Sequence, residues 1–191
     1  MNEQTMGKTL FQALPLGRKW CEAIQLEDGR QFLLRPIQPS DARTLQRSFQ
    51  TLTPQEIRMR FMHPMSELSG EYAKRLCSVD DQEGFALVVV EAKPPEEALI
   101  GAVARLAIDN SGYEAEFAII VGRELRRLGL GRYLMQHLIA WAGDKGLKAI
   151  YGFILDENRP MLRLMNEMGF SVGPSDIDTG ISLARYALDR N

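Results

Sequence analysis

The stretch that decides the fold lies in the second half of the chain and reads Glu116-Phe117-Ala118-Ile119-Ile120-Val121-Gly122-Arg123-Glu124-Leu125-Arg126-Arg127-Leu128-Gly129-Leu130-Gly131-Arg132. The apolar residues 117–121 predict a buried strand, and the glycines after them predict a turn that opens a helix. Free backbone N–H groups and the positive end of a helix dipole meet at such a turn, where an anion can bind. We therefore expect a phosphate loop at residues 126–132. In the alternative interpretation, Gly129 and Gly131 only shape a turn and the arginines are solvated.

Two better-known phosphate loops fit this chain poorly. A P-loop requires Gly-x-x-x-x-Gly-Lys followed by Ser or Thr, but the nearest string, Gly7-Lys8-Thr9, has neither the first glycine nor a preceding strand. A Rossmann fingerprint requires a third glycine where Leu134 stands, early in a run of strand–helix units. Only one more such unit follows residue 134, so the Rossmann interpretation is weakly supported.

Strands and helices alternate around the phosphate loop in an order that indicates a mixed sheet. An amphipathic helix over residues 129–143 joins the strand before the loop to another strand, which makes a strand–helix–strand crossover. The turn at residues 109–112 favours an antiparallel pairing of the two strands it connects. The predicted strands of this half cover residues 85–90, 99–108, 113–121, 149–155 and 181–188, and a last helix covers residues 160–168.

The first half of the chain contains a hairpin and three short helices. Two strand-like segments, residues 20–26 and 31–37, flank the turn Asp28-Gly29. Ser40 is a predicted helix N-cap, and Thr53 with Glu56 forms the sequence pattern of a capping box. A third helix is expected over residues 69–76.

These elements predict one domain of the α/β (α+β) class, with a mixed, mostly antiparallel central sheet flanked by helices. A chain of 191 residues can bury about 70% of its unfolded surface as a single domain. Residues 1–19 have weak periodicity and are expected to form an N-terminal arm, and residues 20–191 the domain. We find no internal repeat in the sequence.

Composition argues against several classes of function. The chain has 23 Lys and Arg against 25 Asp and Glu, a formal charge of −2, so it has no basic field that would attract nucleic acid. Its longest apolar run, residues 85–90, is far shorter than the roughly 20 residues that span a membrane. The N-terminus lacks the pattern of a signal peptide, and we expect a cytoplasmic protein.

Metal and disulfide chemistry are also disfavoured. The two cysteines, Cys21 and Cys77, are far apart and have no metal-ligand spacing, so both are expected to be reduced thiols. The two histidines, His63 and His137, have no ligand-spaced partner, and no metal site is expected. His137 lies beside the apolar face of its helix, where packing is the favoured role.

The phosphate loop resembles the acyl-CoA pyrophosphate loop of the GNAT superfamily of N-acetyltransferases, in which Arg-x-x-Gly-x-Gly follows a buried strand. The stretch from Asn158 to Phe170 is similar to the later Asn-to-Gly-Phe helix motif of that superfamily. The resemblance covers about residues 20 to 188. Four further stretches look most like the acetyltransferase module of bacterial protein lysine acetyltransferases: Asp28-Gly29, residues 34–42, residues 58–61 and residues 116–118.

The resemblance implies a GNAT fold with acetyl-CoA as the acyl-donor cosubstrate. It implies that the strand at Ile119, Ile120 and Val121 binds the pantetheine arm through main-chain hydrogen bonds, with Ile119 and Val121 offering them. It implies that Asn158 contacts CoA. The residues expected to hold the pyrophosphate, chiefly through backbone N–H groups, are Arg126, Arg127, Leu128, Gly129, Leu130, Gly131 and Arg132.

Glu116 is the candidate general base. It stands within an apolar strand, where desolvation would raise the pKa of a carboxylate toward a useful value. The matching glutamate in the lysine acetyltransferases is the general base, which the resemblance carries over to Glu116. Two alternatives remain: Glu116 pairs with an arginine such as Arg105 across the sheet, or Glu114, on the same face, is the base.

The expected function is transfer of an acetyl group from acetyl-CoA to an amine, most specifically a protein lysine side chain. A small-molecule amine and a non-catalytic acyl-CoA sensor are the alternatives. Many relatives have a tyrosine general acid where this chain has Met165, so no acid is assigned. Expected partners are acetyl-CoA and an acceptor such as an acyl-CoA synthetase, without nucleic acid or membrane, and the chain is expected to be a monomer or homodimer.

Overall fold

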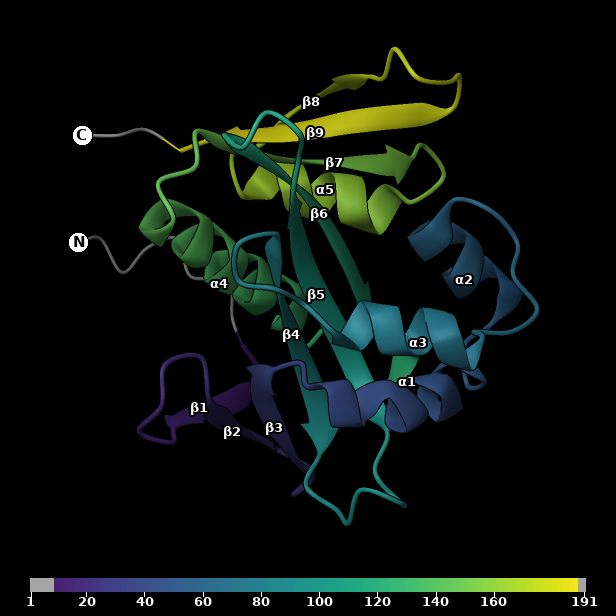
Figure 1. Cartoon of the computed structure of the whole chain (residues 1–191), viewed down its shortest axis with the longest axis vertical. Helices are drawn as coiled ribbons and strands as arrows, with labels where there is room; N and C mark the ends of the chain where they lie inside the picture. The colour runs from purple at the N-terminus through teal and green to yellow at the C-terminus, as the bar shows by residue number, and fades with distance from the viewer. Residues whose placement is uncertain (1–8, 189–191) are drawn as a thin grey trace.

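The computed structural model describes residues 9–188, and within them nine strands form one sheet in the order β1-β2-β3-β4-β5-β6-β7-β9-β8 (Figure 1). Every neighbouring pair is antiparallel except β6 with β7, which is parallel. The predicted mixed, mostly antiparallel sheet is therefore confirmed. The strands are β1 (Phe11–Pro15), β2 (Glu22–Leu26), β3 (Gln31–Pro36), β4 (Gly84–Glu91), β5 (Ile100–Ile108), β6 (Glu114–Val121), β7 (Ala149–Leu155), β8 (Ser171–Pro174) and β9 (Ile181–Ala187).

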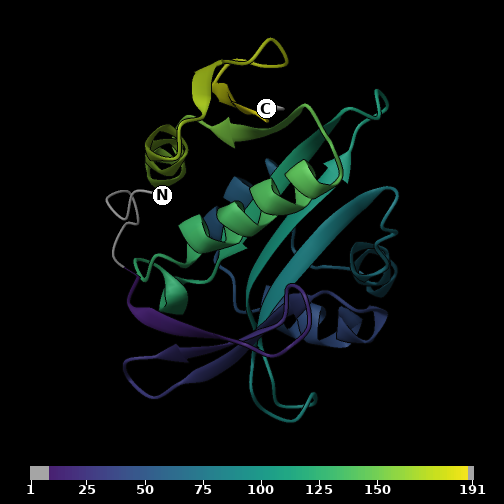
Figure 2. The same cartoon turned by 90° about the vertical axis from the view of Figure 1, so that its left-hand side faces the viewer.

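The helices cover both faces of the sheet. One face carries α4, and the other carries the group α1, α2 and α3, as Figure 2 shows from the side. The helix α5 packs beside β8. Short 3₁₀ turns η2 (Pro39–Asp41) and η3 (Arg123–Leu125) precede α1 and α4, and the helices are α1 (Ala42–Phe49), α2 (Pro54–Phe61), α3 (Gly70–Cys77), α4 (Leu130–Asp144) and α5 (Arg159–Glu167).

Apolar side chains fill the space on each face of the sheet. On one side, Leu134 and Leu138 of α4 are fully buried against Ala104 and Leu106 of β5, and the small alanine leaves room for the helix to approach. On the other side, Phe49 and Ile57 belong to a second cluster that joins α1, α2 and α3. The period-2 alternation of β5 therefore sends its odd-numbered side chains toward α1, α2 and α3.

Two strands were not expected from the sequence. Residues 11–15 of the expected N-terminal arm form β1, which pairs with β2, and Phe11 packs on the ring of Tyr133 at 5.3 Å between centroids. The rest of that arm, residues 1–8, lies outside the described residues. The second strand, β8, has only four residues and contains Gly173 and Pro174, which are poor strand formers. Both form through pairing with a neighbour, which local patterns do not report.

Of the three helices predicted in the first half of the chain, two begin where the sequence predicts. Thr53 and Glu56 form the predicted capping box of α2, with Thr53 N–H donating to Glu56 Oε2 at 2.7 Å. Ser69 caps α3. The prediction of Ser40 as an N-cap is wrong, because Ser40 lies inside η2 and the N-cap of α1 is Asp41, whose carboxylate is held by Arg35 and the Gln38 N–H.

The parallel strands β6 and β7 diverge, and this divergence positions the functional site. They pair only at Glu114 with Ala149, Ala115 with Ile150 and Glu116 with Tyr151. Beyond those pairs the two strands separate, as their directions in Figure 1 show. One edge of β6 is therefore left without a neighbouring strand from residue 117 onward. No helix within residues 9–188 is long and apolar enough to cross a membrane.

Candidate active site

The open edge of β6 presents the main-chain groups of alternate residues. Gly122 N–H donates to Gly101 O at 2.8 Å, and Asp109 N–H donates to Glu114 O at 2.9 Å, so even-numbered residues of β6 turn their backbone toward β5. The N–H and C=O groups of Ile119 and Val121 therefore point to the open side. Ile120 is placed differently: its backbone faces β5 and its side chain lines a cavity under α1, α2 and α3.

Glu116 stands where β6 and β7 part, opposite Ala107 on one side and Tyr151 on the other. Its side chain reaches solvent, and within residues 9–188 its carboxylate has no hydrogen bond or ion pair. Desolvation by the surrounding protein raises the pKa of Glu116 above its ordinary value, while the guanidinium of Arg60 opposes that rise. The alternative in which Arg105 pairs with this carboxylate is not what the structure has.

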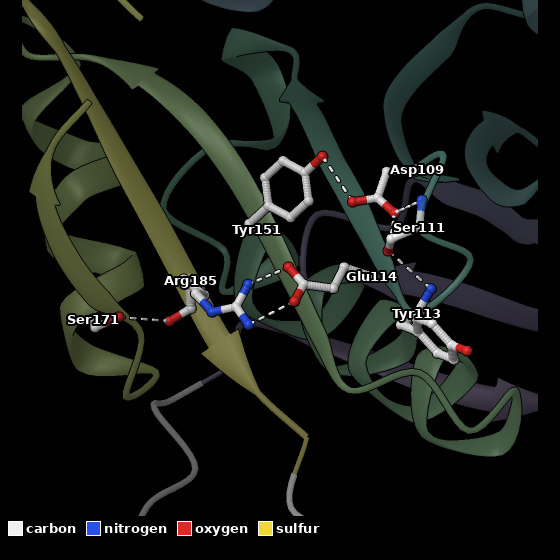
Figure 3. Close-up of polar contacts among 7 residues, drawn as sticks. All are labelled: Asp109, Ser111, Tyr113, Glu114, Tyr151, Ser171 and Arg185. Carbon is white, nitrogen blue, oxygen red and sulfur yellow. Dashed lines mark hydrogen bonds and ion pairs between the residues drawn. The ribbon is translucent and has the colours of Figure 1, made fainter. Parts of the chain in front are cut away.

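Glu114, the alternative base, is occupied by another residue. Its two carboxylate oxygens accept hydrogen bonds from both terminal nitrogens of Arg185 on β9, one of them at 2.8 Å (Figure 3). This hydrogen bonding by Arg185 lowers the pKa of Glu114 below its ordinary value. Tyr151 lies on β7, the strand between β6 and β9, and its hydroxyl points to Asp109 Oδ2 at 3.5 Å. A carboxylate held in this way is a poor proton acceptor, so the geometry favours a structural role for Glu114.

The phosphate loop turns sharply before α4. Arg127 and Gly129 both have left-handed backbone angles, with φ of 62° and 85°. The first N–H groups of a helix have no partner within that helix, so those at the start of α4 are directed to the loop. A Cβ atom on Gly131 would lie 3.4 Å from Leu164 Cδ2 of α5. Gly129 therefore supplies the left-handed backbone angle, and Gly131 permits the close approach of Leu164. Both glycines keep the loop open for a ligand.

Two arginines of the phosphate loop already have acidic partners. Arg126 Nη2 lies 2.6 Å from Glu56 Oε1, and Arg126 Nε donates to the open-side carbonyl of Val121 at 3.1 Å. Arg132 Nη2 lies 2.7 Å from Glu167 Oε2. Arg127 is exposed and forms no ion pair within residues 9–188. The cationic side chain left for an anionic ligand here is that of Arg127.

The two leucines of the phosphate loop and Asn158 hold the backbone around it. Leu130 is buried in the core, and the Leu128 carbonyl accepts a hydrogen bond from Leu10 N–H at 3.0 Å. Asn158 caps α5, because its side-chain oxygen accepts from Met161 N–H at 3.3 Å. Met165 is fully buried within α5.

His137 packs as expected, between the Tyr133 ring at 4.6 Å and the Trp20 ring at 5.6 Å. Its Nδ1 lies 3.0 Å from Tyr133 O, and its Nε2 lies 3.3 Å from Glu22 Oε1. Both cysteines are free thiols, and burial raises the pKa of Cys77 to about 11.

The helix-side cavity, defined as the space that α1, α2 and α3 enclose against β5 and β6, has a volume of about 320 Å³. Most of its lining is apolar, but Arg60 of α2 and Arg105 of β5 also line it. Burial lowers the pKa of Arg60 to about 10 and lowers that of Arg105. Sequence reasoning did not identify this pair, although an arginine at an inward position of the apolar strand β5 is a signal for it.

Comparison with known proteins agrees with this geometry. Residues 31–171 match the model of the family described as "Acetyltransferase (GNAT) domain". The chain is 29% identical over 177 residues to the acetyltransferase PA5475 of Pseudomonas aeruginosa, which covers 93% of each protein.

Solved structures show the same fold. The GNAT domain of the PAT protein of S. lividans superposes with a TM-score of 0.77 at 21% identity, which covers 91% of this chain and 100% of that one. The spermidine N-acetyltransferase of Vibrio cholerae, solved with CoA and spermine, superposes with a TM-score of 0.63 at 20% identity, which covers 82% and 95%. The chain described here belongs to the GNAT family and is an acetyl-CoA-dependent N-acetyltransferase.

Proposed function

We propose that this enzyme acetylates a lysine side chain of a protein, with Glu116 as the general base. The observation that carries the proposal is the carboxylate of Glu116, which has no partner within residues 9–188, lies at the point where β6 and β7 diverge and has a raised pKa. A free carboxylate at that point lies next to the open strand edge. A raised pKa moves the base closer to the operating pH.

The reaction needs a proton acceptor. A lysine amine with a pKa near 10.4 is only about one part in a thousand neutral at pH 7.4. Glu116 accepts the proton as the amine attacks the thioester carbonyl, and the C–S bond then breaks to release the CoA thiolate. With a thiol pKa near 8.5, that thiolate leaves without a dedicated acid, consistent with the buried Met165 on α5.

The open edge of β6 and the phosphate loop are the proposed binding surface for acetyl-CoA. Main-chain groups of Ile119 and Val121 receive the pantetheine arm like an added strand. The pyrophosphate lies on the backbone N–H groups at the start of α4, with Arg127 as the free cation of the loop. Arg126 must release the Val121 carbonyl when that arm binds. Asn158, at the start of α5, completes the contact with CoA.

A protein acceptor is favoured over a polyamine by the charge of the helix-side cavity. Four arginines and the three glutamates Glu56, Glu91 and Glu124 line this cavity, and Arg60 and Arg105 are the arginines among them that have no ion pair or hydrogen bond within residues 9–188, so they would repel a polycationic amine. The partner-free carboxylate of Glu116 also favours catalysis over a non-catalytic acyl-CoA sensor, since a sensor has no use for a base. The acceptor is a cytoplasmic protein, and an acyl-CoA synthetase is the first one to examine.

Mass spectrometry tests the acceptor class. A cell extract is treated with acetyl-CoA and either the enzyme or its Glu116→Gln variant, and a parallel panel contains amino acids and polyamines. We expect a few lysines to be acetylated far above the variant control, and little turnover of spermidine. Efficient turnover of a small amine without any lysine above that control would replace the protein-lysine proposal.

A further inference from the structure

Arg60 and Arg105 differ from the other arginines around them. Arg30 and Arg123 also line the helix-side cavity, but Arg30 pairs with Asp28 at 2.8 Å and Arg123 donates to Thr51 O at 3.0 Å. Arg60 and Arg105 form no ion pair and no hydrogen bond within residues 9–188. The Arg60 guanidinium only stacks near the Phe61 ring, at 4.8 Å from its centroid.

The guanidinium nitrogens of Arg60 and Arg105 keep some contact with open space. Within the described part of the chain, no side-chain nitrogen or oxygen is both fully enclosed and without a hydrogen-bond partner. The unpartnered guanidinium nitrogens of Arg60 and Arg105 are therefore not fully enclosed, and both residues line the cavity. Two cations come from separate elements, α2 and β5, to one cavity, and within residues 9–188 neither is paired with Glu56, Glu91 or Glu124, the acids that also line it.

This arrangement is unfavourable in the free enzyme. Burial removes each guanidinium largely from water, and this burial lowers the pKa of both Arg60 and Arg105. Arg105 further lowers the pKa of Arg60 by charge repulsion. Two like charges that are desolvated and unpaired cost stability, and an anion between them would relieve that cost.

The cavity is also placed for the acceptor. Arg105 faces Ala118 across the β5–β6 pair, and Ala107, two residues on, faces Glu116, so all four share one face of the sheet. Glu116 is close enough to Arg60 for the two charges to affect each other's pKa. A group bound between the arginines would therefore be held near the base.

From this geometry we infer that Arg60 and Arg105 form a carboxylate-binding subsite that receives a carboxylate carried by the acceptor beside its reacting amine. The inference rests on the proposed function of Glu116 and adds the substrate class. In a protein acceptor, the carboxylate is an Asp or Glu side chain next to the target lysine. In a small acceptor, it is the carboxylate of an amino acid. Planar guanidinium groups suit a carboxylate because both can form two parallel hydrogen bonds.

Matched acceptors test the subsite on the CoA-loaded enzyme by calorimetry and on the acetyl-CoA-loaded enzyme by initial rates. The first pair is N-acetyl-Lys-Glu-amide and N-acetyl-Lys-Gln-amide, and the second is the reversed dipeptides Glu-Lys and Gln-Lys, blocked in the same way. The third pair is free lysine and lysinamide. In at least one pair, we expect the member with the carboxylate to bind about 10- to 100-fold more tightly than the member with the amide. The reason is that its hydrogen bonds to the arginines are charge-assisted.

Variants assign the preference to the two arginines. In Arg60→Gln and in Arg105→Gln the preference should fall to near unity, with acetyl-CoA affinity unchanged. Arg30→Gln is the matched control, since it removes the same charge from the same cavity at a residue that already has a partner. This control should keep the full preference.

The outcomes separate the subsite from the proposed function. Equal responses to acid and amide in every pair, absent responses included, would overturn the subsite. Preference that survives in both variants would also overturn it. A preference seen only for free lysine supports the subsite and assigns the carboxylate to a small acceptor. Selective binding of an acid that is never acetylated would leave the subsite standing and overturn the proposed acetylation of a lysine side chain.

Discussion

Arg126 of the phosphate loop and Glu56 of α2 join the two halves of the site, with Nη2 of one 2.6 Å from Oε1 of the other. The Glu56 side chain is only 6% exposed, and its second oxygen accepts the Thr53 N–H of the capping box. One carboxylate therefore fixes both the start of α2 and the side chain of Arg126, which donates to the Val121 carbonyl.

Removing this carboxylate should destabilise the protein. We expect Glu56→Ala to lower the free energy of unfolding by about 1–3 kcal/mol, because the cap hydrogen bond and a partly buried ion pair are both lost. Glu56→Gln keeps an oxygen that can accept from Thr53 and should lose about half as much. Urea denaturation of the two variants measures the difference, and equal stability of Glu56→Ala and the parent would contradict this account.

Glu116→Gln should abolish most of the activity without harming the fold. The amide keeps the shape of the side chain but cannot accept a proton, so kcat should fall by about 10²- to 10⁴-fold with acetyl-CoA affinity retained. Because the folded protein raises the pKa of Glu116, ionisation of this group destabilises the fold as the pH rises past its ordinary value. The melting temperature of the variant at pH 7 should therefore equal or exceed that of the parent. Near-parental turnover from pH 6 to 9 would remove Glu116 from the mechanism.

Glu114→Gln is the matched control two residues away, and the expected effects are reversed. Arg185 lowers the pKa of Glu114, so the pair stabilises the fold above the ordinary carboxyl pKa and loses this effect as the pH falls through the lowered value. We expect a lower melting temperature than the parent at pH 7, a gap that narrows toward pH 3, and kcat within a few-fold of the parent. Thermal unfolding across pH and steady-state kinetics measure both; a loss of activity as large as that of Glu116→Gln would restore Glu114 as a candidate base.

Much of this site follows from the sequence, and the part that does not has a physical reason. The strand, turn and helix around Gly129 are local patterns, and apolar spacing together with glycine predicts them. The divergence of β6 and β7 and the pairing of Glu114 with Arg185 depend on register between distant strands, which no local pattern contains. Arg60 and Arg105 lie 45 positions apart and line one cavity because α2 packs against β6, the strand beside β5.

The backbone of the phosphate loop can be tested through its left-handed residue. Gly129 has φ of 85°, which a β-branched side chain cannot adopt without strain. Gly129→Val should weaken acetyl-CoA binding at least 10-fold by calorimetry. The control is Gly180→Val, whose φ of 83° imposes the same strain in open space in the turn before β9. It should lose stability but keep acetyl-CoA affinity, and unchanged affinity in Gly129→Val would reject the loop as the pyrophosphate site.

The two cavity arginines should differ in their effect on the pH profile. The Arg60 guanidinium lowers the pKa of Glu116 by charge attraction, whereas Arg105 does not shift that pKa. Loss of the Arg60 charge should therefore raise the pKa of Glu116 further, and the acidic limb of kcat/KM should move to higher pH in Arg60→Gln. In Arg105→Gln that limb should stay within about 0.2 pH units of the parent, a shift too small to reflect a direct charge partner. Profiles measured from pH 5 to 9 with an amide acceptor, which has no carboxylate for the subsite, isolate the base. An identical shift in both variants would mean that the arginines act on Glu116 as one charged cluster.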